Sequence, residues 1–497
     1  MQSRGDWQED LFVASPLREL VPDDHILKRV DAVLDLSWLH EAVRGCYCQD
    51  NGRPSIDPER VLRLMLAGFF QGIVHDRKLM REAQVNLAIR WFAGYRLDEV
   101  LPERSSLTRI RQRWGAPLFR SIFERTVAQC MEAGLVSADT VHIDATLIRA
   151  DVSWDSLTTR HAEQVVEVND EKAASDGDDE PPTGRRGRPR KKKIKPQKYS
   201  PTDPDATMST SCKQYHLEPT YKQHTAVEDK NGVIVDVSVT TGQANEGKQL
   251  IEQVERIEAT LNDHVACVTC DAGYAHGANY ATLEQRGTDA VIPPPRIAPR
   301  KKGTQRIPAR RFKYDEHHDR ITCPAGSHLH RKSCTPSTNG RYYRARSSDC
   351  KNCPLRERCF SAKAVSRTIL IGEGYTALLR ARRRKEKGWD ESTREKYKRH
   401  RWQVEGVHGR SKTQHGLSRA IGRGLTNVTI QSYLTAAVMN LKKLAKKHPA
   451  TKDQYRLTQA CTRLTTQFYA LWTSIRQHHK INTPKGYAPP PKQLFTN

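Results

Sequence analysis

The stretch Thr140–Ile148, with the sequence TVHIDATLI, decides the fold class of this chain. It is rich in β-branched residues and carries apolar side chains at both odd and even positions. A strand with this pattern is buried on both faces, as in the sheet of an α/β domain. One acidic residue, Asp144, stands inside this apolar run, where a lone carboxylate is costly to bury.

The residues after this strand predict the rest of the domain. Tyr221–Glu228 and Val233–Thr240 are expected as two strands, because the Asn231-Gly232 pair between them is typical of a hairpin turn. Four more elements are expected in order: a helix at Glu246–Leu261, a buried strand at Val265–Cys270, a helix at Asn279–Arg286 and a strand at Asp289–Ile292. This order predicts an α/β fold of the RNase H-like type, in which helices flank a mixed sheet.

The regions around this core differ from it in composition. Residues 1–135 are expected as an all-α N-terminal domain, since Asp57-Pro58-Glu59 is a strong helix start followed by apolar residues at helical spacing. This domain is either a small DNA-binding bundle or an ordinary helical domain with a solvated basic face. The other boundaries are a core segment at 139–295 with a disordered basic linker at 155–215, a basic, Cys-rich insertion at 296–375, a second core segment at 376–450 and a tail at 451–497.

The charge of the chain indicates which class of binding partner to expect. Its 82 Lys and Arg residues outnumber its 57 Asp and Glu residues, which gives a formal net charge of +25 over 497 residues. A polyanion is the commonest partner of so basic a chain. A membrane partner is not expected, because no stretch approaches the roughly 18 consecutive apolar residues of a spanning helix. Because the N-terminal MQSRGDWQED lacks the apolar region of a secretory signal, we expect a cytoplasmic protein with reduced cysteines.

Three acidic residues stand where a metal site could form. Asp144 lies within the first strand, Asp271 follows the strand at Val265–Cys270, and Glu405 lies in the helical stretch YKRHRWQVEGVHGRSKTQHG. Carboxylates on separate elements suit Mg²⁺, and paired Mg²⁺ ions activate the attacking and leaving oxygens of phosphoryl transfer. Each acid also has an ordinary structural explanation: a salt-bridged strand residue, a helix cap, or a surface pair of Glu405 with Arg401.

Together these segments resemble a known family. HIDAT, TCDAGY and Arg-x3-Glu-x6-Lys, the last formed by Arg401, Glu405 and Lys412, resemble the DDE motif of bacterial insertion-sequence transposases. The family's last block begins with a tyrosine, whereas this chain has Lys398 at that position and Tyr397 one residue earlier. The resemblance extends over about residues 20–450, and it implies a bacterial, nucleoid-associated protein.

The resemblance implies a function and its residues. Asp144, Asp271 and Glu405 would be the catalytic residues and the Mg²⁺ ligands, with Mn²⁺ as a substitute metal. Arg401 and Lys412 would hold the phosphates of double-stranded DNA at the terminal inverted repeats. The enzyme would cut these ends and join them to target DNA, as a homodimer or higher oligomer because two ends must be held together. The alternatives are a catalytically inactive RNase H-like DNA-binding protein and a nuclease without strand transfer.

Two further segments carry binding motifs. Cys323, Cys350, Cys353 and Cys359 could form a structural Zn²⁺ site, with His328 or Cys334 as replacement ligands, or could be reduced thiols without a metal. The segment with Arg186, Arg188 and Arg190 resembles an AT-hook, which lies in the minor groove of A·T-rich DNA, or is a disordered linker that touches phosphates. The chain has no Gly-x4-Gly-Lys-Ser/Thr loop, so no nucleotide cofactor is expected.

Overall fold

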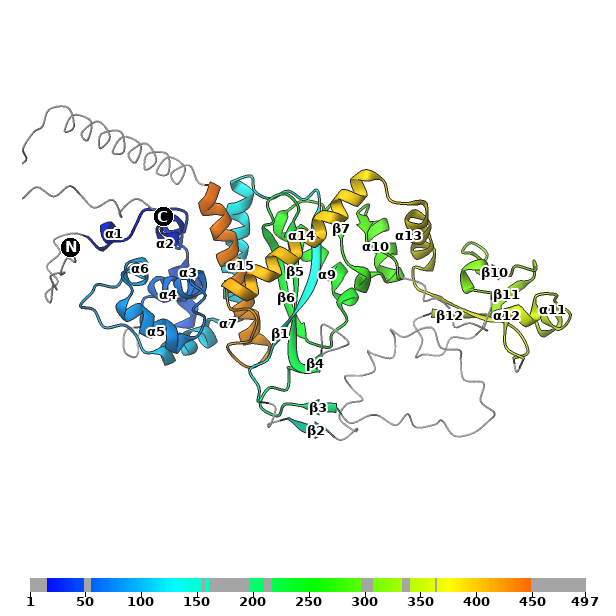
Figure 1. The fold of residues 1–497 in the computed structure, drawn as a ribbon, viewed down its shortest axis with the longest axis horizontal. Helices are drawn as coiled ribbons and strands as arrows, with labels where there is room; N and C mark the ends of the chain where they lie inside the picture. Colours follow the sequence, from blue (N-terminus) through cyan, green and yellow to red (C-terminus); the bar gives the residue numbers. More distant parts are fainter. Residues whose placement is uncertain are drawn as a thin grey trace, which may run out of the picture. The chain divides into compact units, whose positions relative to one another are not determined.

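The computed structural model describes residues 16–48, 55–153, 157–160, 197–209, 217–295, 307–332, 340–362 and 364–447 (Figure 1). The chain divides into two compact units: Met1–Trp114 with Ala437–Asn497, and Gly115–Ala436. The predicted DNA-binding segment with Arg186, Arg188 and Arg190, the alternative zinc ligand Cys334, and the tail at 451–497 lie outside the described residues.

The first unit is helical over its described N-terminal part, as predicted. Asp57 caps its central helix, because the Asp57 carboxylate accepts hydrogen bonds from the backbone N–H groups of Glu59 at 2.8 Å and Arg60 at 3.1 Å. Pro58 occupies the first turn, where its missing N–H costs nothing. The helices are α1 (Leu17–Leu20), α2 (Ile26–Asp31), α3 (Leu39–Val43), α4 (Pro58–Phe70), α5 (Asp76–Val85) and α6 (Leu87–Phe92).

The helix α7 (Arg104–Glu132) is broken at the boundary between the two units. Gly115 has φ 68° and ψ 168°, and Pro117 follows two residues later. Glycine reaches this positive φ without the steric cost of a Cβ, and proline removes a helical hydrogen-bond donor. The local sequence therefore explains why the helix changes direction at this position.

The second unit is built on a mixed sheet. Its central strand β1 (Val141–Arg149) pairs antiparallel with β5 (Glu218–Glu228) and parallel with β7 (Cys267–Thr269). β6 (Ile234–Thr241) pairs antiparallel with β5, and β8 (Asp289–Val291) pairs parallel with β7. The hairpin turn contains Gly232 at φ 65°, and the Glu228 carboxylate accepts the backbone N–H groups of Lys230 and Asn231. The predicted RNase H-like fold class is confirmed.

Helices pack against this sheet (Figure 1). Helix α9 (Glu246–Leu261) contacts β5 and β6, and α14 (Glu391–Gln414) contacts β1, β5, β7 and β8. The helix α9 starts and ends where its sequence predicts: Asn245 caps its first turn, and Asn262 ends it in the left-handed conformation at φ 49°. The second unit also contains α10 (Gly277–Gln285), α13 (Tyr375–Lys387) and the first part of α15 (Leu425–Lys447).

Part of the predicted linker belongs to the core. Within residues 155–215, β2 (Thr158–Arg160) pairs with β3 (Gln197–Tyr199), and β4 (Thr207–Ser209) pairs antiparallel with β5. The description of 155–215 as a disordered linker therefore does not hold for these strands. Three-residue strands are too short to give a periodic signal, so the pattern of the sequence did not reveal them.

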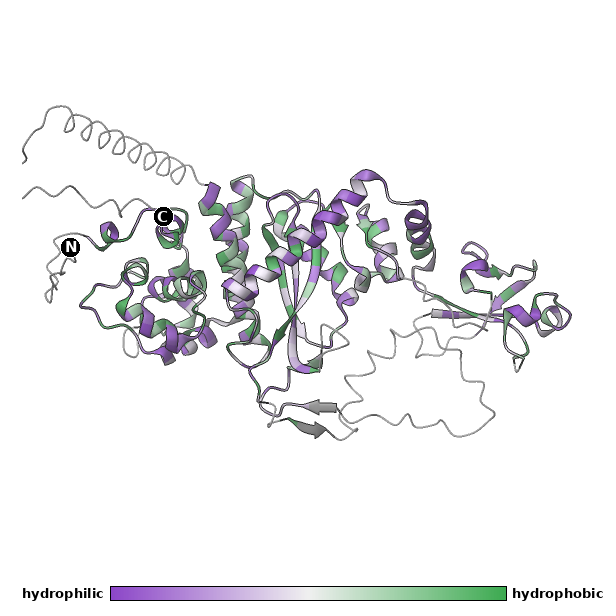
Figure 2. Ribbon diagram, viewed as in Figure 1, coloured by the Kyte–Doolittle hydropathy of each residue, from purple (hydrophilic) through white to green (hydrophobic). Residues whose placement is uncertain are grey.

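The Cys-rich insertion forms a small antiparallel sheet of its own. The strands β9 (Lys313–Asp315), β10 (Arg320–Thr322), β11 (His328–Arg331), β12 (Gly340–Ala345) and β13 (Thr368–Gly372) pair in chain order. Two short helices, α11 (Ser347–Lys351) and α12 (Arg356–Cys359), lie between β12 and β13. The following helix, α13, is hydrophilic along most of its length (Figure 2). No helix in the described part of the chain is both long enough and apolar enough to cross a membrane.

Candidate active site

Two of the three predicted acids line one cavity in the second unit. Asp144 from β1 and Asp271 after β7 border a cavity of about 820 Å³. The two residues meet because β1 and β7 are neighbouring parallel strands, and Asp271 lies just beyond the carboxyl end of β7. Ligand sites of α/β sheets are commonly found at this edge.

Asp144 is held in an unfavourable environment for a carboxylate. Its side chain is 25% exposed and lies on the strand between β5 and β7. Burial raises the pKa of Asp144 to about 7, and the negative charges of Asp271, Glu246 and Glu405 act in the same direction. Both burial and the surrounding negative charges therefore disfavour the ionised form of Asp144.

Asp271 is fixed by the turn that follows it. Its Oδ1 accepts the backbone N–H of Gly273 at 2.8 Å and so caps the short helix η5 (Ala272–Tyr274). Burial and the nearby charge of Glu246 raise the pKa of Asp271, although the hydrogen bond from Gly273 opposes this shift. The helix-capping role considered from the sequence is thus real, and it orients one oxygen of the carboxylate.

Glu405 lies outside the cavity lining. It is 64% exposed on α14, and its Oε1 accepts a hydrogen bond from Nε of Arg401 at 3.1 Å. The surface pair considered from the sequence therefore exists. Exposed i,i+4 pairs contribute only about 0.3–0.5 kcal/mol, so little free energy holds Glu405 in this position. Its charge nevertheless reaches Asp144.

A buried hydrogen-bond chain connects α14 to the strands β1 and β7. His142 on β1 lies 2.6 Å from the hydroxyl of Thr269 on β7 through Nδ1, and the same hydroxyl lies 2.9 Å from Nδ1 of His400 on α14. All three residues are buried. Burial lowers the pKa of His400 to about 3, so its ring is neutral and can share this network without an unpaired charge.

A second anchor lies at the turn between β5 and β6. Asp229 accepts a bidentate pair from Arg399 at 2.7 and 2.9 Å, and it lies 2.8 Å from Nε2 of His142. Although burial opposes it, hydrogen bonds from Arg399 and His142 lower the pKa of Asp229. Gln403 also donates to the backbone carbonyl of Asp229 at 2.5 Å. These contacts fix the position of α14 along its axis and its rotation about that axis, in the part of the helix just before Glu405.

The cavity is bordered by cationic side chains as well as acids. Lys412 from α14 lies in its lining with Arg149, Lys222 and Arg419. Burial, together with the charge of Arg149, lowers the pKa of Lys412. Arg149 and Arg419 are exposed and are paired with Glu218 at 2.7 Å and Asp151 at 3.1 Å. A lining that combines carboxylates and cations suits a phosphodiester that is bound next to a metal.

Three residues near the cavity were not predicted from the sequence. Glu246 begins α9 and lines the cavity, and Lys222 on β5 pairs with it at 2.8 Å. His408 is buried on α14 with its Nδ1 3.9 Å from Oδ2 of Asp144. An acid in the first turn of a helix is common for dipole reasons alone, so the sequence around Glu246 carried no distinct signal.

The donor atoms fit a hard divalent cation. Carboxylate oxygens are the ligands that Mg²⁺ prefers. The hydroxyl of Tyr274, which is fully buried, has no hydrogen-bond partner among the described residues, although the charges of Glu246, Asp144 and Asp271 all act on it. Within the described ranges, no three His, Cys, Asp or Glu side chains already stand close enough together to hold an ion. Side-chain rotation would have to complete the site.

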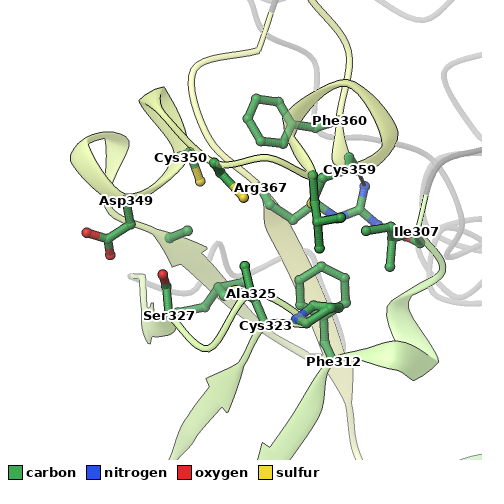
Figure 3. A pocket seen from close by; sticks show the side chains of 15 residues that line it. Ile307, Phe312, Cys323, Ala325, Ser327, Asp349, Cys350, Cys359, Phe360 and Arg367 are labelled. Carbon is green, nitrogen blue, oxygen red and sulfur yellow. Dashed lines mark hydrogen bonds between the residues drawn. The ribbon is translucent and has the colours of Figure 1, made fainter.

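The four predicted zinc ligands line a different cavity, in the insertion. Figure 3 labels three of them, Cys323, Cys350 and Cys359, around this cavity. Cys350 and Cys359 are buried, whereas Cys323 and Cys353 are partly exposed. Cys323 lies at the β10–β11 turn, where the backbone N–H of Gly326 donates to its carbonyl oxygen at 2.9 Å. Burial raises the pKa of the Cys359 thiol, and the other three cysteines act in the same direction although Arg367 opposes it.

Two family models match the chain. Residues 15–113 match the family described as Transposase domain (DUF772), and residues 322–445 match the family described as Transposase DDE domain. The two matches correspond to the helical unit and to the region that carries the insertion and Glu405. Both matches are to transposase families, and together they support an insertion-sequence DDE transposase.

The second match covers only part of the sequence that carries the candidate site. It includes Arg401, Glu405 and Lys412 as well as the four cysteines of the insertion. Asp144 and Asp271 lie outside it, so their assignment depends on the sheet geometry and on the sequence motif. No curated protein matches the chain significantly.

Proposed function

We propose that this transposase binds the ends of its own insertion sequence, cleaves them and joins them to target DNA by metal-dependent, in-line phosphoryl transfer. The observation that carries the proposal is the convergence of Asp144 and Asp271 at one basic-rimmed cavity, with Glu405 on a helix anchored to the same two strands. Acids supplied by separate elements, rather than by one helix, are what a two-metal site requires.

In this proposal Asp144, Asp271 and Glu405 hold Mg²⁺, for which Mn²⁺ can substitute. When bound, the metal supplies activation of the attacking oxygen and stabilisation of the leaving oxygen. Glu405 would leave Arg401 to join Asp144, and the weak surface pair makes this movement inexpensive. Because burial raises the pKa of Asp144 to about 7, a bound cation would favour its ionised carboxylate at neutral pH.

The basic residues would hold the DNA. Arg401, once released from Glu405, presents a planar guanidinium suited to bidentate phosphate binding. Lys412 lines the cavity and would contact the phosphate next to the reacting bond. The segment with Arg186, Arg188 and Arg190 would add contacts to double-stranded DNA at the terminal inverted repeats. A homodimer or higher oligomer on the DNA would hold the two ends together.

We also propose that Cys323, Cys350, Cys353 and Cys359 hold a structural Zn²⁺. All four line one small cavity of the insertion, which supports this set, and side-chain rotation would have to bring their sulfur atoms close enough to hold the ion. Four thiolate ligands leave no open position, so such a metal would be structural. It would stabilise an insertion whose small sheet has a limited apolar core.

The decisive experiment measures excision and joining from a donor plasmid that carries the gene with its native flanking DNA, in the presence of Mg²⁺. Wild type is compared with Asp144→Asn, Asp271→Asn and Glu405→Gln, and Asp139→Asn serves as a matched control because Asp139 forms an exposed pair with Lys230. We expect joined products from wild type and the control, and none from the three site variants, while all of them still bind DNA.

Other outcomes identify the alternatives. Cleaved ends without joined products would indicate a nuclease. DNA binding without any cleavage by wild type would indicate an inactive RNase H-like DNA-binding protein. Full activity of Glu405→Gln would remove Glu405 from the site.

A further inference from the structure

We propose that Glu246 is a fourth carboxylate of the metal site, and that Lys222 is the protein cation that occupies this carboxylate in the metal-free enzyme. The inference rests on the proposed function and adds two residues to it. Neither residue belongs to the motif that the sequence shares with its family.

The geometry places Glu246 opposite Asp271. A Cβ added to Gly273 would stand 3.0 Å from Oδ1 of Asp271 and 3.2 Å from Oε2 of Glu246, so the two carboxylates approach the same point from different elements. Glu246 and Asp271 also line the cavity that contains Asp144. A side chain larger than hydrogen at Gly273 would separate the two acids.

A buried amide holds this arrangement together. Nδ2 of Asn279 donates to the carbonyl oxygen of Gly247 at 2.8 Å and to that of Tyr274 at 3.0 Å. It thereby joins the residue after Glu246 to the short helix that follows Asp271. Because Asn279 is buried, both bonds are protected from water, and the start of α9 is fixed relative to Asp271.

One buried hydroxyl that is influenced by the charges of this cluster lacks a protein partner among the described residues. The Tyr274 hydroxyl is fully buried and lacks a hydrogen-bond partner among the described residues, although it lies within reach of the charges of Glu246, Asp144 and Asp271. Buried hydroxyls are nearly always hydrogen-bonded, to protein or to water. A hydrated cation among the three acids would bring water molecules that this hydroxyl can bind.

Lys222 supplies a positive charge next to Glu246, as a bound metal ion would. Its ammonium group lies 2.8 Å from Oε1 of Glu246 and also donates to the carbonyl oxygen of Ala244 at 2.9 Å. The Lys222 side chain is 12% exposed and that of Glu246 is 27% exposed, so water screens this pair less than a surface pair. The pair therefore competes with a divalent cation for the Glu246 oxygens.

The test measures Mn²⁺ binding to the full-length enzyme without DNA, by calorimetry and by electron paramagnetic resonance of the free ion. Glu246→Gln keeps the shape of the side chain and removes its charge. Glu252→Gln is the matched control, because Glu252 lies on the same helix, is 66% exposed and pairs with Arg256. Lys222→Gln removes the competing cation, and Asp144→Asn and Asp271→Asn report on the site itself.

We expect Glu246→Gln to weaken Mn²⁺ binding roughly tenfold or more and Lys222→Gln to strengthen it, with Glu252→Gln unchanged. If Glu246→Gln binds Mn²⁺ like wild type while Asp144→Asn and Asp271→Asn do not, the inference is wrong and the proposed function stands. If neither aspartate variant alters Mn²⁺ binding, the proposed metal site itself fails. Loss of the ion pair should lower the melting temperatures of both Glu246→Gln and Lys222→Gln in chelator, so Mn²⁺ binding is compared at a temperature where all variants are folded.

Discussion

Asp144 is placed where a carboxylate costs stability. Burial and neighbouring negative charges raise its pKa to about 7 in the folded protein, against an ordinary value of 3.8. Between these two values the folded chain retains a proton that the unfolded chain has released. The free energy of unfolding therefore falls as the pH rises from about 4 to 7, by up to about 1.4 kcal/mol per pH unit.

Asp144→Asn should accordingly stabilise the metal-free protein. In chelator at pH 8 we expect the variant to exceed wild type in free energy of unfolding by roughly 1–3 kcal/mol, and at pH 4 we expect almost no difference. Urea denaturation at the two pH values measures this. A variant less stable than wild type at pH 8 would show that Asp144 makes favourable contacts that outweigh the charge repulsion.

Arg401 is expected to affect strand transfer strongly and the free energy of unfolding very little. Because its pair with Glu405 is exposed, Arg401→Ala should change the free energy of unfolding by less than about 0.5 kcal/mol. The same variant should reduce strand transfer roughly a hundredfold, since a donor to a reacting phosphate is lost.

Arg394→Ala is the matched control for Arg401, because Arg394 lies on the same helix and forms a similar exposed pair with Glu391 at 3.7 Å. Single-turnover assays on pre-cut ends separate the chemical step from end binding. Equal activities of the two variants would argue against a role of Arg401 in the reaction.

At the scale of elements, α14 depends on contacts distant from the reacting atoms. The carboxylate of Asp229 accepts a hydrogen bond from Arg399 and lies next to His142, and its backbone carbonyl accepts one from the amide of Gln403. This cluster connects α14 to the β5–β6 turn. Asp229→Ala would leave Nε2 of His142 and the guanidinium of Arg399 without their carboxylate partner, whereas Gln403 would keep its bond to the backbone carbonyl. We expect a loss of roughly 1–3 kcal/mol in free energy of unfolding, less than for a fully buried pair because Arg399 is 41% exposed.

The Asp229 variant should also lower the rate of strand transfer in protein that is still folded, because Glu405 is carried by the released helix. Asp139→Ala, which breaks only an exposed pair, should alter neither quantity. Chemical denaturation and strand-transfer assays at a temperature where both variants are folded measure the two effects. Unchanged catalysis in folded Asp229→Ala would show that α14 is positioned without this anchor.

The insertion offers a test of its proposed zinc. Purified protein should contain about one Zn²⁺ per chain by elemental analysis, and Cys350→Ser or Cys359→Ser should lose it. Cys46→Ser, at a partly exposed cysteine outside the insertion, should retain it. Zinc removal should lower the melting temperature of the protein. Protein that is purified without chelator and contains no zinc would identify these cysteines as plain thiols.

For the whole molecule, the net charge of +25 predicts DNA binding that weakens strongly with salt. Each phosphate contact contributes about 0.9 to the slope of log affinity against log salt concentration. Replacing Arg186, Arg188 and Arg190 by alanine should therefore reduce this slope by about 2–3. Binding measured on A·T-rich and G·C-rich duplexes separates the two readings of this segment. An AT-hook predicts a larger loss on A·T-rich DNA, whereas a plain basic linker predicts equal losses.

The sequence by itself determined the order of the core elements. Their signals are local: β-branched runs predicted β1 and β7, Asn231-Gly232 predicted the hairpin, and apolar spacing predicted the full length of α9. The motif residues Asp144, Asp271 and Glu405 were likewise found from short segments. Periodicity and turn chemistry extend over only a few residues, so a single sequence is sufficient to read them.

The tertiary structure alone decided which side chains meet. Lys222 and Glu246 stand 24 positions apart in the sequence, and Asp229 and Arg399 form a pair across 170 positions. Strand pairing places β1 between β5 and β7, and thereby brings together acids whose local sequences have nothing in common. The burial that raises the pKa of Asp144 arises from the same packing. Such contacts depend on the path of the whole chain, for which no local pattern of residues provides a signal.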